Sequence, residues 1–197
     1  MAGTPAGLAC FVDVETTGLN PRRDEVVELA CVLFAFDWTT GEIHGVVDTY
    51  QGLRQPSVPI PPAAARIHGL SDNDVRGHDL DYPRLRAMLA RAEFVVAHNA
   101  SFDRAFVARL IPEALQRPWY CSMRGVDWYR RGFRSRGLQP LLRAHRLDGG
   151  RAHRAGSDAV AAVGLLASRD PRNPHGPPYF SDLLRSITAR AAAQPPR

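Results

Sequence analysis

The feature that most constrains the fold is a stretch of buried-strand sequence into which two acids are set. Residues 8–14 (LACFVDV) are apolar on both faces, the pattern of a central strand in a sheet covered on both sides. Asp13 and Glu15 lie two residues apart, so both side chains point to one face at the carboxyl end of the strand. Open α/β sheets place their active sites at that end.

Two carboxylates side by side in a partly dry place need a cation. They repel each other and resist ionisation unless a positive charge neutralises them. The chain contains no lysine, and all 25 of its basic residues are arginine. The simplest candidate is a divalent ion with oxygen ligands, Mg²⁺ or Mn²⁺. For an isolated D-x-E pair the alternative, two solvated acids in a polar loop, would be favoured.

Composition sets the outer bounds. A chain of 197 residues with 45% hydrophobic content suits one domain with a full core. The net charge of +5 is compatible with a nucleic-acid partner, although many basic proteins bind none. Cys10, Cys31 and Cys121 are odd in number and lack C-x-x-C spacing, which indicates core thiols in a reducing compartment. With no signal-peptide pattern and no apolar run of ~18 residues, we expect a cytoplasmic protein without membrane association.

The remaining pattern predicts a mixed sheet flanked by helices. Residues 26–36 and 42–50 are expected to form a hairpin around the turn 37–41, and the apolar run 94–97 a buried parallel strand. A further strand is expected at 119–123, and helices at 62–67, 82–91, 138–147, 157–167 and 180–193. Another helix is expected to follow the polar cluster 98–103 and to end at about residue 111. The fold class is therefore α/β: a five-stranded sheet with an antiparallel hairpin of strands 1–3, parallel strands after it, and helices on both faces.

Three regions are expected along the chain. Residues 1–7 form an N-terminal tail, and residues 8–168 form the folded domain. Residues 169–197 comprise a proline-rich loop, a C-terminal helix and a frayed tail.

Two further acids open helices later in the chain. Asp103 lies in the first turn of the helix after strand 94–97, where the helix dipole alone would favour an acid. Asp158 opens a mostly buried helix and therefore needs a partner. His153 lies five residues earlier, in the preceding loop. Taken singly, Asp103 is explained by the dipole and His153 as a surface histidine.

Taken in order, D-x-E-T-T-G-L, H-N-A-x-F-D and H-x-A-x-x-D resemble the motifs of the DEDDh 3′→5′ exonucleases. This family includes the proofreading subunit of bacterial DNA polymerase III, RNase T and oligoribonuclease. The resemblance covers residues 8–168, and residues 67–71 (IHGLS) and 138–142 (LQPLL) also look like family segments. Gly156 stands where members usually carry leucine, so looser packing under His153 is expected. Residues 119–123 and the tail after Arg169 match no family segment.

The resemblance implies an RNase H-like fold and a site holding two Mg²⁺ or Mn²⁺ ions. Asp13, Glu15 and Asp158 would bind the ion that carries the attacking water, and Asp13 would also bridge to the second. Asp103 would hold the second ion largely through water. Two such ions stabilise the nucleophile and the leaving 3′ oxygen. His153 would act as general base.

The resemblance also implies a set of substrate contacts. The segment Thr16, Thr17, Gly18 and Leu19 would cradle the terminal nucleotide, and Phe102 would stack on the next base. Phe102 is equally well explained as a core residue. His68, with His98 and Asn99, completes the predicted substrate-binding set, although a turn role for His68 and a capping role for Asn99 remain open. A cluster of arginines could follow the phosphate backbone or lie in a solvated loop: Arg130, Arg131, Arg134 and Arg136.

The leading hypothesis is a metal-dependent 3′→5′ exonuclease that releases 5′-mononucleotides from single-stranded ends. DNA is slightly favoured as substrate, and a ribonuclease T-like or oligoribonuclease-like RNA trimmer is the alternative. A DNA polymerase or repair complex is a candidate partner, and both a monomer and a homodimer fit. A competing class is an inert scaffold that binds nucleic acid or a polymerase. A zinc hydrolase is disfavoured because thiolate ligands and H-E-x-x-H spacing are missing.

Overall fold

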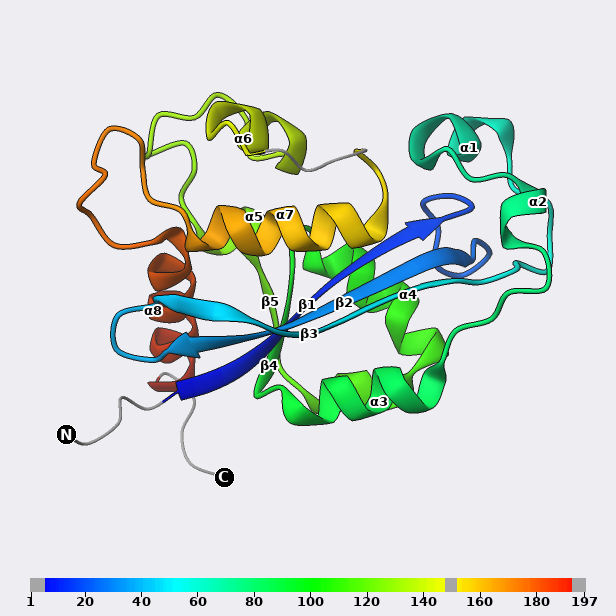
Figure 1. Ribbon diagram of the computed structural model, residues 1–197, viewed down its shortest axis with the longest axis horizontal. Helices are drawn as coiled ribbons and strands as arrows, with labels where there is room; N and C mark the ends of the chain where they lie inside the picture. The colour runs from blue at the N-terminus through cyan, green and yellow to red at the C-terminus, as the bar shows by residue number, and fades with distance from the viewer. Residues whose placement is uncertain (1–5, 148–151, 193–197) are drawn as a thin grey trace.

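The computed structural model describes residues 6–147 and 152–192. Five strands form one sheet in the order β3-β2-β1-β4-β5 (Figure 1). β1 (Ala6–Thr16), β2 (Val26–Asp37) and β3 (Ile43–Leu53) pair antiparallel in sequence order. β4 (Phe94–Ala97) runs parallel to β1, and β5 (Trp119–Cys121) runs parallel to β4. The predicted mixed five-stranded sheet is confirmed.

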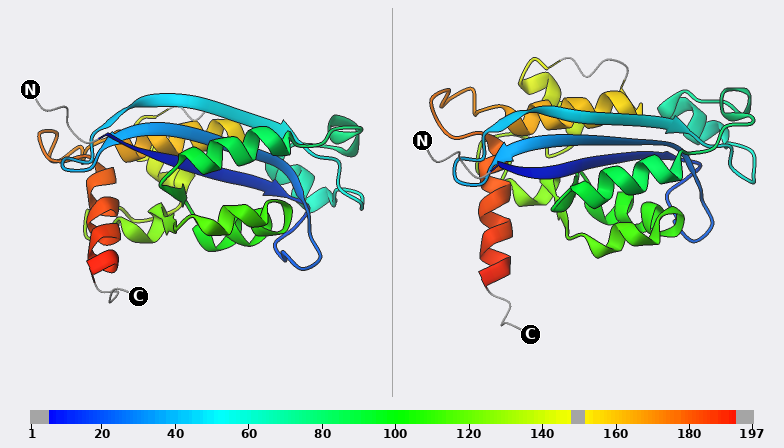
Figure 2. Two further views of the ribbon diagram at one scale, coloured as in Figure 1. Left: turned by 90° about the horizontal axis from the view of Figure 1, so that it is seen from below. Right: turned by 60° about the horizontal axis from the view of Figure 1, so that its bottom comes forward.

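Helices cover both faces of this sheet, as Figure 2 shows for α7 on one side and α3 and α4 on the other. Beneath α7 lies an aromatic core in which Phe34, Phe36 and Phe180 are fully buried. Beneath α3 and α4 lies a second core built on the opposite faces of β1 and β2. The helical elements are α1 (Pro62–His68), α2 (Asp72–Val75), α3 (Tyr82–Arg91), α4 (Ala100–Leu110), the 3₁₀ turn η1 (Pro112–Gln116), α5 (Ser122–Gly125), α6 (Leu138–Ala144), α7 (Ala155–Ala167) and α8 (Tyr179–Ala192).

Several boundaries differ from the sequence-based expectation. β1 begins at Ala6 because β2 extends to Asp37 and pairs with it, so the end of the predicted tail 1–7 belongs to the sheet. Residues 1–5 and 193–197 of the two predicted tails lie outside the described residues. The strand expected at 119–123 stops at Cys121, and Ser122 begins the short helix α5. α7 begins at Ala155, two residues earlier than predicted.

β4 covers only part of the length of β1. β4 pairs with β1 only from Ala9 to Phe11, whereas β1 continues to Thr16. Beyond Phe11, the edge of β1 that faces β4 therefore has no strand beside it. The chain leaves β4 there and enters α4, so the first turn of that helix comes to lie against the end of β1.

The thiols of Cys10, Cys31 and Cys121 are free, and the first two are fully buried. Within the described ranges, no helix combines the length and the apolar composition needed to cross a membrane.

Candidate active site

Four acids come from three elements that meet at the carboxyl end of β1. Asp13 and Glu15 are partly exposed and alternate with the buried Val12 and Val14, as the two-residue period of a strand requires. Asp103 lies in the first turn of α4, and Asp158 in the first turn of α7. These last two are 4% and 5% exposed.

Asp103 reaches β1 through the gap that β4 leaves. Its Oδ1 accepts a hydrogen bond of 3.2 Å from the backbone N–H of Val14. That N–H lies beyond the last residue of β1 that pairs with β4, so a carboxylate takes the place of a strand carbonyl. The bond fixes Asp103 beside Asp13 and Glu15, which flank Val14 in the chain.

Asp158 is held from two sides and draws His153 into the site. Its Oδ2 accepts a 3.0 Å hydrogen bond from the backbone N–H of His153, and its Oδ1 accepts one of 2.8 Å from Gln139 Nε2. One ligand atom each of Glu15, His153 and Asp158 lies within 4.8 Å of the others. His153 is exposed and has a φ of 59°, a left-handed backbone that is uncommon for a residue with a side chain.

All four acids have raised pKa values. Burial raises the pKa of Asp13 well above its usual range, and the charges of Asp103, Glu15 and Asp158 add to that effect. Burial and the charge of Asp158 raise the pKa of Glu15 to about 8. Burial also raises the pKa of Asp103 to about 7 and moves that of Asp158 upward. Such a group favours a bound cation, because only a positive charge lets all four carboxylates ionise together.

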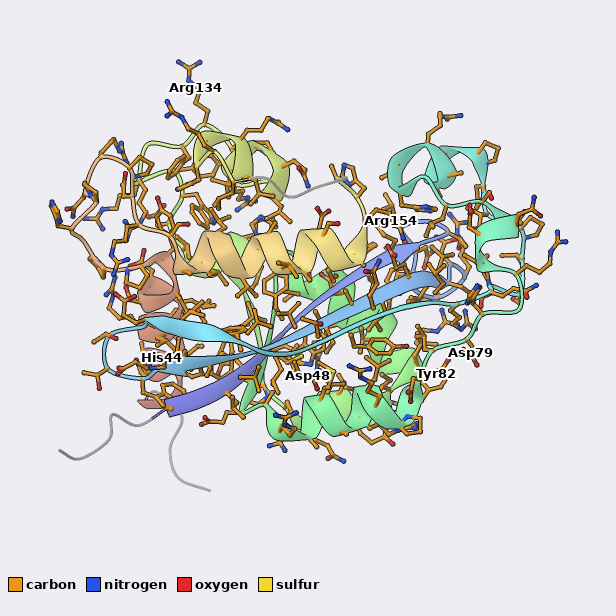
Figure 3. The ribbon with its side chains drawn as sticks, viewed as in Figure 1. His44, Asp48, Asp79, Tyr82, Arg134 and Arg154 are labelled. Carbon is orange, nitrogen blue, oxygen red and sulfur yellow. The ribbon has the colours of Figure 1, made fainter. Side chains whose placement is uncertain are left out.

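Sequence reasoning missed a fifth acid, Glu28 on β2. It is fully buried and accepts hydrogen bonds from Arg154 Nη2 at 2.7 Å, from the Ala155 N–H at 2.8 Å and from Gln51 Nε2 at 2.6 Å. Figure 3 shows Arg154 between the start of α7 and the ends of the strands. This cluster, Glu28, Arg154, Ala155 and Gln51, fastens the start of α7 to the sheet. A lone acid in an otherwise apolar strand was the available signal.

The same cluster explains Gly156. A Cβ at this position would overlap the side-chain oxygen of Gln51, so the glycine leaves space for the amide that bonds Glu28. The expectation of looser packing is therefore wrong: the space that a leucine would take is filled by Gln51.

The segment after β1 is shaped by its own polar groups. Thr16 Oγ1 donates to the carbonyl of Gly18 at 2.6 Å, and Thr17 Oγ1 accepts from the Glu25 N–H at 2.9 Å. Both threonines are buried, whereas Leu19 is 82% exposed. A side chain at Gly18 would displace the carboxylate of Asp24, which accepts a hydrogen bond from the Asn20 N–H. The result is a fixed turn that presents one apolar side chain to solvent beside the acids.

The two histidines of the predicted substrate set have different environments. His68 is buried at the end of α1; its Nδ1 accepts from the Leu70 N–H at 3.1 Å, and its Nε2 has no hydrogen-bond partner among the described residues. His98 Nδ1 lies 3.0 Å from Ser122 Oγ, and its Nε2 lies 2.8 Å from the carbonyl oxygen of Arg136. Both ring nitrogens of His98 therefore have internal partners, and its contact with a nucleotide stays a prediction.

The remaining candidates lie at the start of α4 and in the segment after α5. Phe102 is half-buried and packs on Phe106, while Asn99 is exposed at the helix start. The arginines of the predicted cluster have different surroundings. Arg131 is bound by Asp182, whereas Arg134 projects away from the protein (Figure 3).

Comparison with known proteins places this geometry in a family. The sequence pattern of the RNase T exonuclease family matches residues 10–166, which hold all four acids and His153. The chain belongs to this exonuclease family. The resemblance inferred from the three motifs is thereby confirmed.

Individual relatives agree with this assignment. The chain is 33% identical over 131 residues to the PolC-type DNA polymerase III of Thermotoga maritima, matching 63% of this chain and 8% of the polymerase. It is 31% identical over 117 residues to ribonuclease T of Actinobacillus pleuropneumoniae, matching 51% of each chain. The match thus spans a small part of the polymerase and about half of the ribonuclease.

Solved structures share the fold. Exonuclease I of E. coli, in a zinc-bound complex with single-stranded DNA, superposes with a TM-score of 0.68 at 16% identity, covering 94% of this chain and 45% of that one. Exonuclease X in complex with 5′-overhanging duplex DNA gives a TM-score of 0.53 at 23% identity, covering 95% and 94%.

Proposed function

We propose that this protein is a divalent-metal-dependent 3′→5′ exonuclease that releases 5′-mononucleotides from single-stranded ends. The observation that carries the proposal is the group of four carboxylates with raised pKa values at the end of β1. Arg154, whose charge acts on Glu15, is already paired with Glu28. Within residues 6–147 and 152–192, no arginine forms an ion pair with the four acids, so the site offers carboxylate donors for a bound cation.

The donor set fits hard divalent ions. Carboxylate oxygens are the ligands that Mg²⁺ and Mn²⁺ prefer, and no thiol takes part. Asp13, Glu15 and Asp158 would hold one ion, and Asp103 would complete the site for a second. When bound, such ions stabilise negative charge on the attacking and leaving oxygens of a phosphodiester. The acids of this chain would fix where that positive charge lies beside the reacting phosphate.

His153 is the proposed general base. A ring nitrogen of this exposed residue lies within 4.8 Å of carboxylate oxygens of Glu15 and Asp158, so it reaches the site. It would take a proton from the attacking water as the water oxygen bonds to phosphorus and the bond from phosphorus to the 3′ oxygen breaks. The 3′ oxygen would leave with the shortened strand and take up a proton from solvent. The backbone N–H of His153 is fixed by Asp158, which orients the residue.

The proposed function also assigns residues that would contact the substrate. The turn at Thr16, Thr17, Gly18 and Leu19 would receive the terminal nucleotide, with Leu19 against its base. Phe102 would pack beside the next base, and Asn99 is exposed close by. His68 would contact the terminal nucleotide through its ring, and burial lowers the pKa of this histidine.

Whether DNA or RNA is the substrate follows from neither set of relatives alone. The exonuclease I and exonuclease X structures contain DNA, whereas a ribonuclease T is among the sequence relatives. We favour DNA, with an RNA-trimming exoribonuclease as the alternative. The polymerase relatives support a DNA polymerase or repair complex as partner. The odd number of cysteines and their lack of C-x-x-C spacing support a reducing, cytoplasmic location.

The test uses single-stranded DNA and RNA of equal length, labelled at either end, with Mg²⁺, Mn²⁺ or EDTA. We expect metal-dependent shortening from the 3′ end, with 5′-mononucleotides as products. Asp13→Asn should abolish it, whereas Asp79→Asn, an exposed acid at the periphery (Figure 3), should not. If neither polymer is cut, including two- to five-nucleotide RNA, the protein is an inert scaffold instead.

A further inference from the structure

A groove of ≈ 1160 Å³ lies on the β5 edge of the molecule, beside the active site but not part of it. Its walls are the start of α4, the segment from η1 through β5 to α5, and one face of α8. α8 lies on the same side as β5 and α5 (Figure 2), and α5 packs against it. Leu183 and Ser186 of α8 form the far wall, outside the family match of residues 10–166.

The groove is positively charged. Its lining includes three arginines and no acid: Arg104, Arg117 and Arg124. In residues 6–147 and 152–192 none of the three forms an ion pair, although eleven pairs occur elsewhere in that part of the chain. Arg117 donates to the carbonyl of Ala90, whereas Arg104 and Arg124 are exposed. This surface therefore favours an anionic ligand.

The groove connects directly to the catalytic acids through α4. Ser101 and Arg104 line it, and Arg104 is the residue after Asp103, which faces the end of β1. One helix thus has the second acid on one side and the groove on the other. A strand whose 3′ end lies at the acids would pass the start of α4, where Asn99 and Phe102 lie, before entering the groove.

The ligand is better explained as nucleic acid than as a peptide added to the sheet edge. β5 has three residues, which gives an incoming peptide strand few backbone partners. Trp119 and Tyr120 are half-buried in the lining and, with Leu115, 44% exposed, supply apolar surface between the charges. Guanidinium groups interleaved with aromatic rings are the chemistry that holds single-stranded nucleic acid.

We propose that this groove binds the phosphodiester backbone of a single strand upstream of the 3′ end that is being cut. The inference rests on the proposed exonuclease function and assigns α8 a role in substrate binding. The groove recognises phosphates, which DNA and RNA share, so it accepts either polymer.

The test uses the double variant Arg104→Glu/Arg124→Glu. Its matched control, Arg76→Glu/Arg143→Glu, makes the same change of charge at the end of α2 and on α6. All four side chains are exposed, and melting curves verify that both variants are folded. Binding of fluorescent 20-nucleotide DNA and RNA is measured by anisotropy with Ca²⁺, so the measurement does not depend on cleavage. We expect the groove variant to bind about tenfold more weakly, with a salt slope lower by ~1.4 for two lost phosphate contacts.

Hydrolysis separates the groove from the catalytic site. The groove variant should cleave a dinucleotide at the wild-type rate while its KM for the 20-nucleotide strand rises about tenfold. Equal losses on both substrates, or equal binding losses in the control variant, would overturn the groove assignment. A wild-type protein that binds the strand through these arginines but cleaves nothing would instead overturn the proposed exonuclease function and leave the groove standing.

Discussion

Glu15 and Glu28 lie directly opposite each other on β1 and β2, yet their pKa values shift in opposite directions. Burial and the charge of Asp158 raise the pKa of Glu15 to about 8. Burial alone would also raise the pKa of Glu28, but hydrogen bonds from Arg154 and Gln51 lower it below its ordinary value. The charge of Glu28 is balanced by Arg154 within the chain, whereas the charge of Glu15 would be balanced by a bound cation.

This contrast predicts opposite effects of the same substitution. Without metal at pH 8, Glu15→Gln should stabilise the protein by roughly 1 kcal/mol, discounted for partial exposure, because it removes a repelled charge. Glu28→Gln should destabilise it by about 1–3 kcal/mol, because charged hydrogen bonds to Arg154 are lost. Urea unfolding in EDTA measures both. Two changes of the same sign would contradict the electrostatic assignment.

The raised pKa values also predict how stability depends on pH in EDTA. An acid with a raised pKa contributes stability that is complete below its unfolded value and is lost as the pH rises through the folded value. For Glu15 this window runs from 4.5 to about 8, and for Asp103 from 3.8 to about 7. The melting temperature should therefore fall between pH 5 and pH 8.

Saturating Mg²⁺ should remove most of that fall, because an ion that binds only the folded site stabilises it. Calorimetry with and without Mg²⁺ measures the difference, and Asp13→Asn serves as a control that should flatten the EDTA curve. A metal-free protein that becomes more stable from pH 5 to pH 8 would show that the four acids do not repel as described.

The contact between Gly156 and Gln51 predicts that the effect of Gly156→Ala on stability changes sign with the residue at position 51. In the native chain, Gly156→Ala gains about 1 kcal/mol of helix propensity but displaces the amide that bonds Glu28, which costs about 1.5–3 kcal/mol. The net effect should be destabilising. In a Gln51→Ala background the space is open, so Gly156→Ala should stabilise by about 0.5–1 kcal/mol. A double-mutant cycle on unfolding free energies measures this coupling, and additive effects would exclude it.

Substitution of His153 is expected to lower activity without lowering stability. His153→Asn keeps a residue that tolerates the left-handed backbone at this position but removes the proposed base. The rate constant kcat should fall by about 10²–10⁴, and the melting temperature should stay unchanged because the side chain is exposed. Mg²⁺ binding by calorimetry is the companion measurement. If kcat stays within threefold of the wild type, another group takes the proton.

Much of the sheet was predictable because its strands carry strong apolar patterns. The strand at residues 94–97 has the predicted bounds, because its four apolar residues are flanked by the polar Glu93 and His98. The length of the strand after η1 was overestimated, because all of residues 119–123 look like strand sequence and only 119–121 form one. Ser122 instead enters a helix turn in which its hydroxyl meets His98, a contact between segments 24 residues apart.

The site was predictable where residues act through a local motif, and unpredictable where they act across strands. The gathering of the four acids agrees with the three motifs and their order. The role of Glu28 depends on the register of β2 against β1 and on Gln51 from β3, and neither is visible in the sequence. Gly156 was misjudged for the same reason, because its neighbour in space is more than a hundred residues away in the chain.

The short pairing between β1 and β4 has a thermodynamic consequence. A β4 longer by two residues would add ladder hydrogen bonds and make a more stable sheet, but it would claim the Val14 N–H that now binds Asp103. The fourth carboxylate would then have no place beside the other three. The Val14 N–H can either extend the sheet, which would add stability, or hold Asp103, which the proposed activity needs. In this chain it holds Asp103.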